Sequence, residues 1–111
     1  MSSKGRVRYM RLLVFFDLPV GTAVQRKRYA QFRKYLVKDG FLMLQQSVYS
    51  KLVINEAAAS SAISRMKRHR PLEGLVQVLR VTEKQYATMT CITGCEAEHE
   101  EVDTVEEFLV L

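Results

Sequence analysis

A nearly continuous apolar run covers residues 9–16 and is interrupted by Arg11 alone. A strand that is covered on both faces has this pattern, so we expect a buried strand that ends at Asp17. The strand stops there because Pro19 cannot donate to a sheet ladder and Gly21 permits a turn. The chain therefore places one carboxylate at the end of an apolar strand.

A helical period replaces the apolar run after residue 21. Thr22 and Gln25 form the T-x-x-Q pattern of a capping box, in which each side chain accepts from a backbone donor of the other residue. The apolar positions recur at i, i+3 and i+7, and they are Tyr29, Phe32 and Leu36. Gly40 suits the position just past the helix end, where a positive φ is favoured. We therefore predict a helix that begins after Thr22 and ends before Gly40.

Five further segments are rich in strand-forming residues and are predicted as strands: residues 41–44, 47–53 and 75–82, and the short runs 90–93 and 108–111. Gln45 and Gln46 join the first two segments and fit a bulged or kinked connection as well as a tight hairpin. A helical turn is expected over residues 83–89.

A second helix is predicted between the strands at 47–53 and 75–82. Asn55 is a good N-cap for it, and Pro71 ends it after Arg70. Its apolar stripe consists of Ala59, Ala62, Ile63 and Met66. The element order is then β-α-β-β-α-β with C-terminal additions, which predicts an α+β, ferredoxin-like sandwich.

The expected architecture leaves one sheet face without helices. That face holds apolar positions, so we expect the chain to form a homodimer through it. The length of 111 residues fits one domain. We divide it into a flexible basic lead over 1–8, a ferredoxin-like domain over 9–90 and an acidic C-terminal extension with short strands over 91–111.

Composition narrows the class of protein. Apolar residues make up 48% and charged residues 26%, which is ordinary for a globular domain and excludes wholesale disorder. No apolar run approaches the 18 residues of a membrane span. The basic lead is not followed by the apolar region of a secretory signal. We therefore expect a cytoplasmic protein that does not bind a membrane.

The net charge of +5 is unevenly distributed along the chain. Residues 1–84 hold all 17 Lys and Arg and five acids, which gives +12; residues 85–111 hold seven acids and neither Lys nor Arg, which gives −7. A strongly basic body attracts polyanions such as nucleic acid. The acidic segment either screens this charge or contacts a basic partner.

Two clusters of cations fall on the two predicted helices. Either these side chains are simply solvated, or they contact phosphates without reading bases. Lys and Arg at the end of a helix also interact favourably with its dipole, which explains part of the second cluster without any partner. The candidate nucleic-acid contacts are Arg26, Lys27, Arg33, Lys34, Lys38, Arg65, Arg68 and Arg70.

Asp17 is the candidate catalytic and metal-binding residue. One reading makes it a turn residue that accepts from the following backbone. In the other reading, a two-fold dimer brings two copies of this carboxylate together, where they hold one Mg²⁺ or Mn²⁺. Such a metal activates a water molecule and stabilises charge on a phosphoryl group.

Cys91 and Cys95 are the only cysteines. A zinc site needs about four ligands, and His69 and His99 are too isolated in sequence to complete one, so we expect reduced cysteines with a structural role. The chain has no P-loop, no H-E-x-x-H and no G-x-S-x-G motif.

Several segments together resemble the small CRISPR-associated adaptation proteins that partner the spacer integrase, most closely the form from type II systems. The segments are Tyr9-Met10-Arg11, Leu13-Val14-Phe15-Phe16-Asp17-Leu18-Pro19, Arg26-Lys27-Arg28-Tyr29, Asp39-Gly40-Phe41, Gln46-Ser47-Val48-Tyr49-Ser50-Lys51 and Val81-Thr82-Glu83-Lys84-Gln85. The resemblance covers about residues 9–90. The family often has Tyr before its strand-end aspartate, where this chain has Phe16.

The resemblance implies a homodimer whose C-terminal strands complete the sheet across the subunits. It implies that the dimer supports a duplex spacer precursor and bridges integrase dimers, and it matches Asp17 to the family's metal-binding aspartate. We expect Phe108, Leu109, Val110 and Leu111 to contact the partner. The leading hypothesis is a DNA-binding scaffold in spacer acquisition. The rival is a Mg²⁺-dependent endonuclease acting on RNA or DNA, and a third reading is a toxin-like ribonuclease of the same fold.

Overall fold

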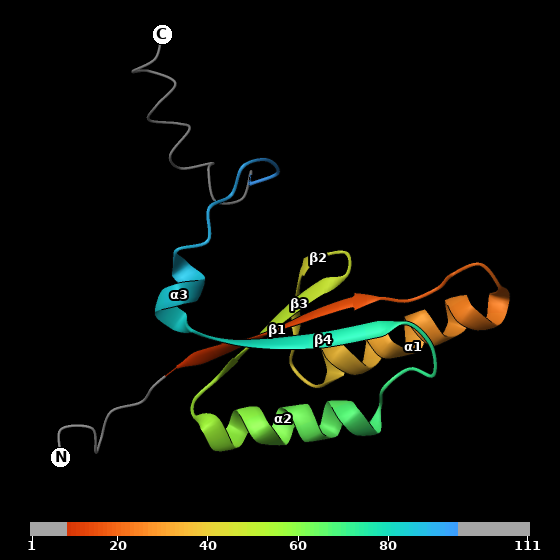
Figure 1. The fold of residues 1–111 in the computed structure, drawn as a ribbon, viewed down its shortest axis with the longest axis horizontal. Helices are drawn as coiled ribbons and strands as arrows, with labels where there is room; N and C mark the ends of the chain where they lie inside the picture. Colours follow the sequence, from red (N-terminus) through yellow and green to blue (C-terminus); the bar gives the residue numbers. More distant parts are fainter. Residues whose placement is uncertain (1–8, 96–111) are drawn as a thin grey trace, which may run out of the picture.

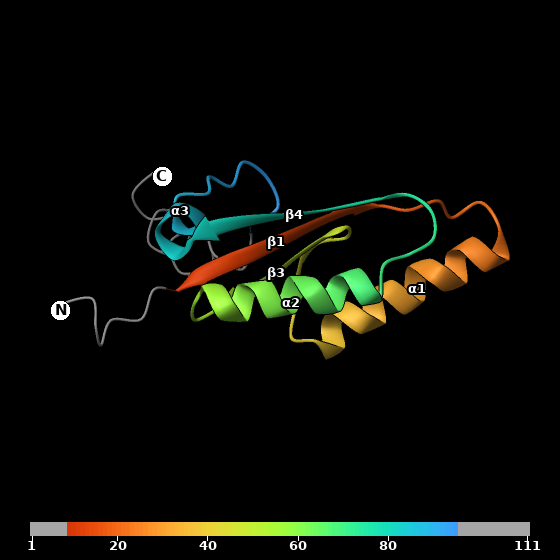
Figure 2. The ribbon, with the colours of Figure 1, turned by 60° about the horizontal axis from the view of Figure 1, so that its bottom comes forward.

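A computed structural model describes residues 9–95 of the chain. Its elements are β1 (Met10–Asp17), α1 (Ala23–Lys38), β2 (Leu42–Gln45), β3 (Val48–Val53), α2 (Glu56–Arg68), β4 (Leu75–Thr82) and α3 (Glu83–Ala87). The strands form one sheet in the order β2-β3-β1-β4, and all neighbours are antiparallel. Figures 1 and 2 show α1 and α2 on the same side of this sheet. The predicted α+β, ferredoxin-like order is confirmed.

The predicted helix caps and turns are present. The Gln25 backbone N–H donates to Thr22 Oγ1 at 3.1 Å, and the Thr22 N–H donates to Gln25 Oε1 at 3.0 Å, which completes the capping box. Asn55 Oδ1 accepts from the Ala58 N–H at 2.7 Å. Gly40 has a φ of 99°, as expected after α1. The two alternatives for the connection at Gln45 and Gln46 are both present: Gln45 pairs with Val48 across a two-residue turn, and the register shifts between Met43 and Gln45.

The core lies between the sheet and the two helices. Alternate residues of β1 point toward the helices and are almost fully buried, and they are Leu12, Val14 and Phe16. The Phe16 ring lies 5.3 Å from that of Phe32 in an edge-to-face arrangement and 5.6 Å from that of Tyr49. Phe16 therefore occupies an apolar position, where a buried hydroxyl would need a partner.

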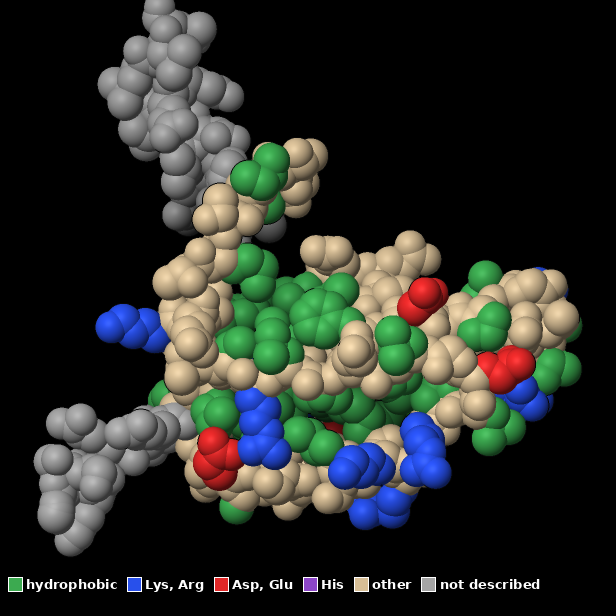
Figure 3. Space-filling model, in the orientation of Figure 1, with side chains coloured by type: hydrophobic (Ala, Val, Ile, Leu, Met, Phe, Trp, Pro, Cys, Tyr) green, Lys and Arg blue, Asp and Glu red, His purple; other side chains and the backbone are tan. Residues whose placement is uncertain are grey.

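The other face of β1 is only partly covered in the single chain. Leu13 is 7% exposed, but Phe15 is 38% exposed and Leu79, the β4 partner of Leu13, is 50% exposed. In Figure 3 the hydrophobic side chains gather over the sheet between α3 and β2. The expectation that both faces of the first strand are buried is met on the helix side and, on the other face, at Leu13 but not at Phe15.

The structure corrects three expectations, which concern one short strand, the end of the second helix and the state of the cysteines. Residues 90–93 form no strand. The second helix ends at Arg68 rather than Arg70, because the His69 backbone N–H already turns to the Met66 carbonyl. Cys91 and Cys95 are joined in a disulfide rather than reduced. A spacing of four residues around Gly94 allows their Cα atoms to approach to 6.2 Å, within the range of a disulfide.

Some expectations fall outside the described residues. They concern the basic lead over 1–8, the acidic run after residue 95 and the partner contacts at Phe108, Leu109, Val110 and Leu111. Within residues 9–95, none of the helices has the length and apolar character that crossing a membrane requires.

Candidate functional site

Asp17 is the last residue of β1 and is exposed. It pairs with Leu75 of β4, and strand alternation places its side chain on the helix-free face, the same face as Phe15. The antiparallel register therefore sets the carboxylate at one end of the apolar face described above.

Gly74 holds the chain close to this strand end, and it is a residue that the sequence pattern did not single out. Its φ is 92°, and a Cβ at this position would lie 2.6 Å from the Asp17 carbonyl oxygen and 2.7 Å from Leu18 Cδ2. Only glycine combines this backbone angle with this approach. The glycine before a strand was a detectable signal, but its contact with Asp17 depends on the pairing of β1 with β4.

The donor set around Asp17 fits a metal ion in part. A carboxylate oxygen is the type of ligand that Mg²⁺ and Mn²⁺ prefer. Among residues 9–95, however, no group of three or more His, Cys, Asp or Glu side chains could hold a metal. Within residues 9–95, one chain thus offers a single carboxylate at this strand end, and a second copy of the chain would bring another.

Three lysines form one exposed stripe on α1. Lys27, Lys34 and Lys38 are separated by seven and four residues, so they share a helix face, opposite the buried Phe32 and Leu36. In the described part of the chain, none of the three ammonium groups is held in an ion pair or a side-chain hydrogen bond. With respect to residues 9–95, these three charges therefore remain available to an anion.

The two predicted arginines of α1 have partners within the chain. Arg26 Nη1 donates to the Val20 carbonyl at 3.1 Å. Arg33 Nε donates to Tyr49 Oη at 3.1 Å, and its guanidinium lies 5.9 Å from the centroid of the Tyr29 ring. Both side chains nevertheless remain exposed beside the lysine stripe.

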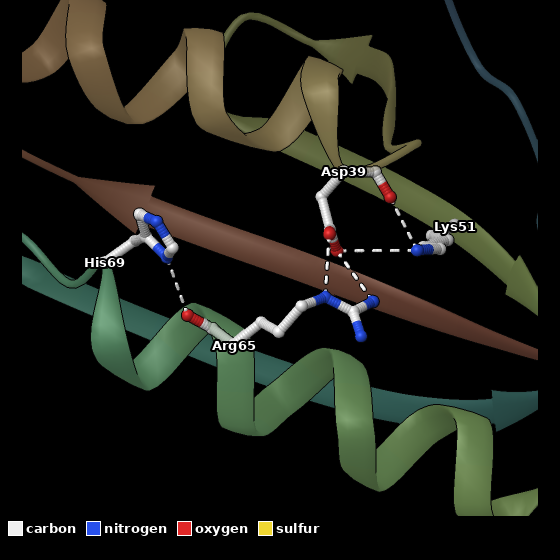
Figure 4. A network of polar contacts seen from close by, with 4 residues as sticks. All are labelled: Asp39, Lys51, Arg65 and His69. Atoms are coloured by element: carbon white, nitrogen blue, oxygen red, sulfur yellow. Dashed lines mark hydrogen bonds and ion pairs between the residues drawn. The ribbon is translucent and has the colours of Figure 1, made fainter.

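Arg65 is held in a cluster that joins three elements, drawn in Figure 4. Its Nε and Nη2 donate to the two carboxylate oxygens of Asp39 at 2.8 and 3.1 Å, and Lys51 Nζ lies 3.4 Å from the same carboxylate. Burial raises the pKa of Asp39, but the Arg65 hydrogen bonds and the Lys51 charge lower it more, so the net pKa is below its ordinary value. Asp39 thus joins the end of α1 to α2 through Arg65 and to β3 through Lys51.

The last two predicted contacts lie at the end of α2. Arg68 is exposed and, among the described residues, makes no side-chain hydrogen bond or ion pair. Arg70 follows the helix and donates from Nη1 to the Lys67 carbonyl at 3.1 Å. Blue side chains gather near this end of α2 in Figure 3. The helices therefore present a cationic layer on the side of the sheet opposite the apolar face.

The geometry defines a class of protein: a small, basic ferredoxin-like domain with a cationic helix layer, an apolar free sheet face and a carboxylate at a strand end. The family model described as CRISPR associated protein Cas2 matches residues 10–89. The chain belongs to this Cas2 family, and the resemblance noted over residues 9–90 is confirmed.

Individual relatives agree with the family match. A protein of Treponema denticola is 53% identical over 102 residues, which cover 92% of this chain and all of the relative. A protein of Streptococcus mutans is 47% identical over 85 residues, covering 77% of this chain and 78% of the relative. A protein of Acidovorax ebreus is 46% identical and covers 77% of this chain and 83% of the relative. Each of the three is named CRISPR-associated endoribonuclease Cas2.

Proposed function

We propose that this protein is a homodimeric subunit of CRISPR adaptation that binds the backbone of duplex spacer-precursor DNA and bridges integrase dimers. Membership of the Cas2 family supports a role in a CRISPR system. The observation that carries the DNA-binding part is the exposed lysine stripe on α1. The protein acts in the cytoplasm, where the repeat array and the integrase are found.

The stripe suits a phosphate backbone better than base edges. Lys27 and Lys38 are eleven residues apart, which corresponds to about 17 Å of helix at about 1.5 Å per residue. Duplex DNA carries one negative charge per about 1.7 Å of its axis, so the stripe passes many phosphates. Ammonium groups on flexible stems neutralise phosphates without the bidentate geometry that reads guanine or adenine. The proposed binding is therefore independent of sequence.

The free sheet face supports dimerisation. Phe15 and Leu79 lose exposed apolar surface if a second copy packs on this face, and the continuous apolar pattern of the first strand is then explained. Because α1 and α2 cover the opposite face, the dimer presents one cationic layer on each outer side. Such a dimer supports the middle of a duplex while leaving other surfaces for the integrase.

Equilibrium binding to a duplex over a range of salt concentrations tests the proposal. The wild-type affinity should fall steeply as salt rises, and scrambling the base sequence should change it little. The triple variant Lys27→Gln/Lys34→Gln/Lys38→Gln should lower the slope of log K against log salt by about 0.9 for each phosphate that it no longer neutralises. Lys84→Gln, a charge removal on α3, is the matched control. A slope that is equal in all three proteins, or a strong base preference, contradicts the proposal.

A second candidate function is a metal-dependent endonuclease that uses paired Asp17 carboxylates. Two observations favour it: Asp17 lies on the same sheet face as Phe15, so a dimer through that face has two such carboxylates, and the relatives carry the name endoribonuclease. A bound Mg²⁺ or Mn²⁺ would supply an activated water molecule and charge stabilisation. The chain itself would contribute the Asp17 carboxylate oxygens as metal ligands.

Cleavage of RNA and DNA in the presence of Mg²⁺ or Mn²⁺ tests this candidate. Asp17→Asn should lower cleavage by orders of magnitude if the carboxylates hold the metal. The control is Glu73→Gln, which removes an exposed acid just before β4 and should leave cleavage unchanged. Equal cleavage by wild type and Asp17→Asn would exclude Asp17 from the chemistry.

A further inference from the structure

Three aromatic rings form a stack that leads from the core to the surface. Phe32 of α1 is 3% exposed, and its ring lies 6.2 Å from that of Tyr35 with an interplanar angle of 29°. The Tyr35 ring lies 4.2 Å from the His69 ring with an angle of 12°. His69 is exposed, so the stack ends on a ring with one face covered by Tyr35 and other surface open to solvent.

The orientation of the His69 ring is fixed by its surroundings. Nδ1 lies 2.9 Å from the Arg65 carbonyl, and because a carbonyl only accepts, the proton of a neutral ring resides on Nδ1. Figure 4 shows this contact beside the bidentate pairing of Arg65 with Asp39. The helix end that carries His69 is thus tied to the C-terminal end of α1. An aromatic platform held in this way loses little entropy when a ligand stacks on it.

A groove lies against this stack. It has a volume of about 300 Å³, which is at the small end of the range for ligand sites. Its α1 side is lined by Arg28, Gln31, Phe32 and Tyr35, and its other side by His69, Arg70, Pro71 and Leu72. Arg28 Nη1 lies 3.7 Å from Glu73 Oε1 in an exposed ion pair. Leu72 is 80% exposed and does not pack in the core. Apolar and aromatic walls beside cationic groups suit a flat heterocycle with an attached phosphate.

We propose that this groove binds one unpaired nucleotide, with its base stacked on the open side of His69 and its phosphate near Arg70, which lines the groove. The inference rests on the proposed nucleic-acid binding and adds to it a preference for unpaired bases. A base in the interior of a duplex has both faces covered by its neighbours and is held in a pair, so it offers no face to His69, whereas an unpaired nucleotide does. Stacking tolerates any base, because every base has a π-face.

Binding of a single-stranded DNA oligonucleotide that contains 2-aminopurine tests the proposal, because the fluorescence of this base changes on stacking. The same oligonucleotide with ribose tests RNA, and a blunt duplex serves as the reference ligand. His69→Ala should weaken single-strand binding by about five- to tenfold, the low end of the effect of removing an aromatic platform, and abolish the fluorescence change. Its affinity for the duplex should stay within about twofold of wild type, because the lysine stripe is intact. His69→Phe should restore both single-strand affinity and the fluorescence change.

The outcomes separate this inference from the proposed function. If His69→Ala weakens single-strand and duplex binding equally, or neither, the groove is not a nucleotide site. If single-strand binding depends on His69 while duplex binding shows no salt dependence, the nucleotide site stands and the duplex scaffold fails. Failure of His69→Phe to restore binding, with a thermal unfolding midpoint like that of wild type, would overturn the stacking argument.

Discussion

Replacing Gly74 by Ala should strongly destabilise the fold at the end of β1. The new Cβ would meet the Asp17 carbonyl oxygen at 2.6 Å and Leu18 Cα at 3.0 Å. Both are backbone atoms, so rotation of a side chain cannot relieve the contact. The φ of 92° adds a further cost for any residue with a Cβ.

The magnitude follows from these two contributions. A left-handed backbone angle costs an ordinary residue about 1–2 kcal/mol, and overpacking costs about 1–3 kcal/mol. Together they predict a decrease in the free energy of unfolding of about 2–5 kcal/mol. Gly94→Ala is the matched control, because Gly94 has a similar φ of 84° but a Cβ there would have no such neighbour within 4 Å. It should cost at most the backbone contribution.

Urea unfolding followed by circular dichroism measures both variants. Gly74→Ala should lower the midpoint by clearly more than Gly94→Ala, with an unchanged m-value. Nuclear magnetic resonance of the folded fraction should show shifted amide signals at Asp17 and Leu18. A Gly74→Ala protein within about 0.5 kcal/mol of wild type, the usual range of an ordinary surface substitution, or equal to Gly94→Ala, would refute the argument that this glycine sets the position of Asp17.

Three other substitutions or truncations test separate parts of the account. Asp39→Asn should lower the free energy of unfolding at pH 7 by about 1–3 kcal/mol in urea, since it leaves the Arg65 and Lys51 cations close together. The folded pKa of Asp39 is below the unfolded value of about 3.9, so the stability that the carboxylate contributes is complete above about pH 4 and is lost as the pH falls through the folded pKa. Wild type and Asp39→Asn should therefore have the same stability in acid. Phe15→Glu places a charge on the free sheet face and should shift sedimentation from dimer to monomer, and an unchanged dimer would exclude that face. Truncation before Phe108 should abolish co-purification with the integrase or weaken the dimer, and a truncated dimer that still co-purifies would exclude the C-terminal contact.

The sequence predicted the elements well where local chemistry determines them. The capping box at Thr22, the N-cap at Asn55 and the positive φ of Gly40 depend on neighbours within a few residues, and all three are present. The strand expected at residues 90–93 is absent, because its β-forming residues have no neighbouring strand within the described chain to pair with. Local propensity alone therefore overestimated the extent of strand structure.

The site was harder to predict, because its contacts join residues that are distant in sequence. A count of cations cannot separate Lys34, which is exposed and without an intramolecular partner among residues 9–95, from Arg65, which pairs with Asp39 across 26 positions. The contact of Gly74 with Asp17 and the stacking of His69 on Tyr35 likewise depend on tertiary packing. Periodicity identified the helix faces but not the side chains already used within the chain.

Reconstituted spacer integration, with purified integrase and a duplex precursor, tests the central claim most directly. The account predicts that Asp17→Asn supports integration near the wild-type level, because the substitution retains the size of the side chain and lies on the sheet face opposite the lysine stripe. It predicts that the Lys27→Gln/Lys34→Gln/Lys38→Gln protein, confirmed as a folded dimer, loses most integration at physiological salt. Full integration by the triple variant, or collapse of integration in a folded Asp17→Asn dimer, would contradict the proposed role as a DNA-binding scaffold.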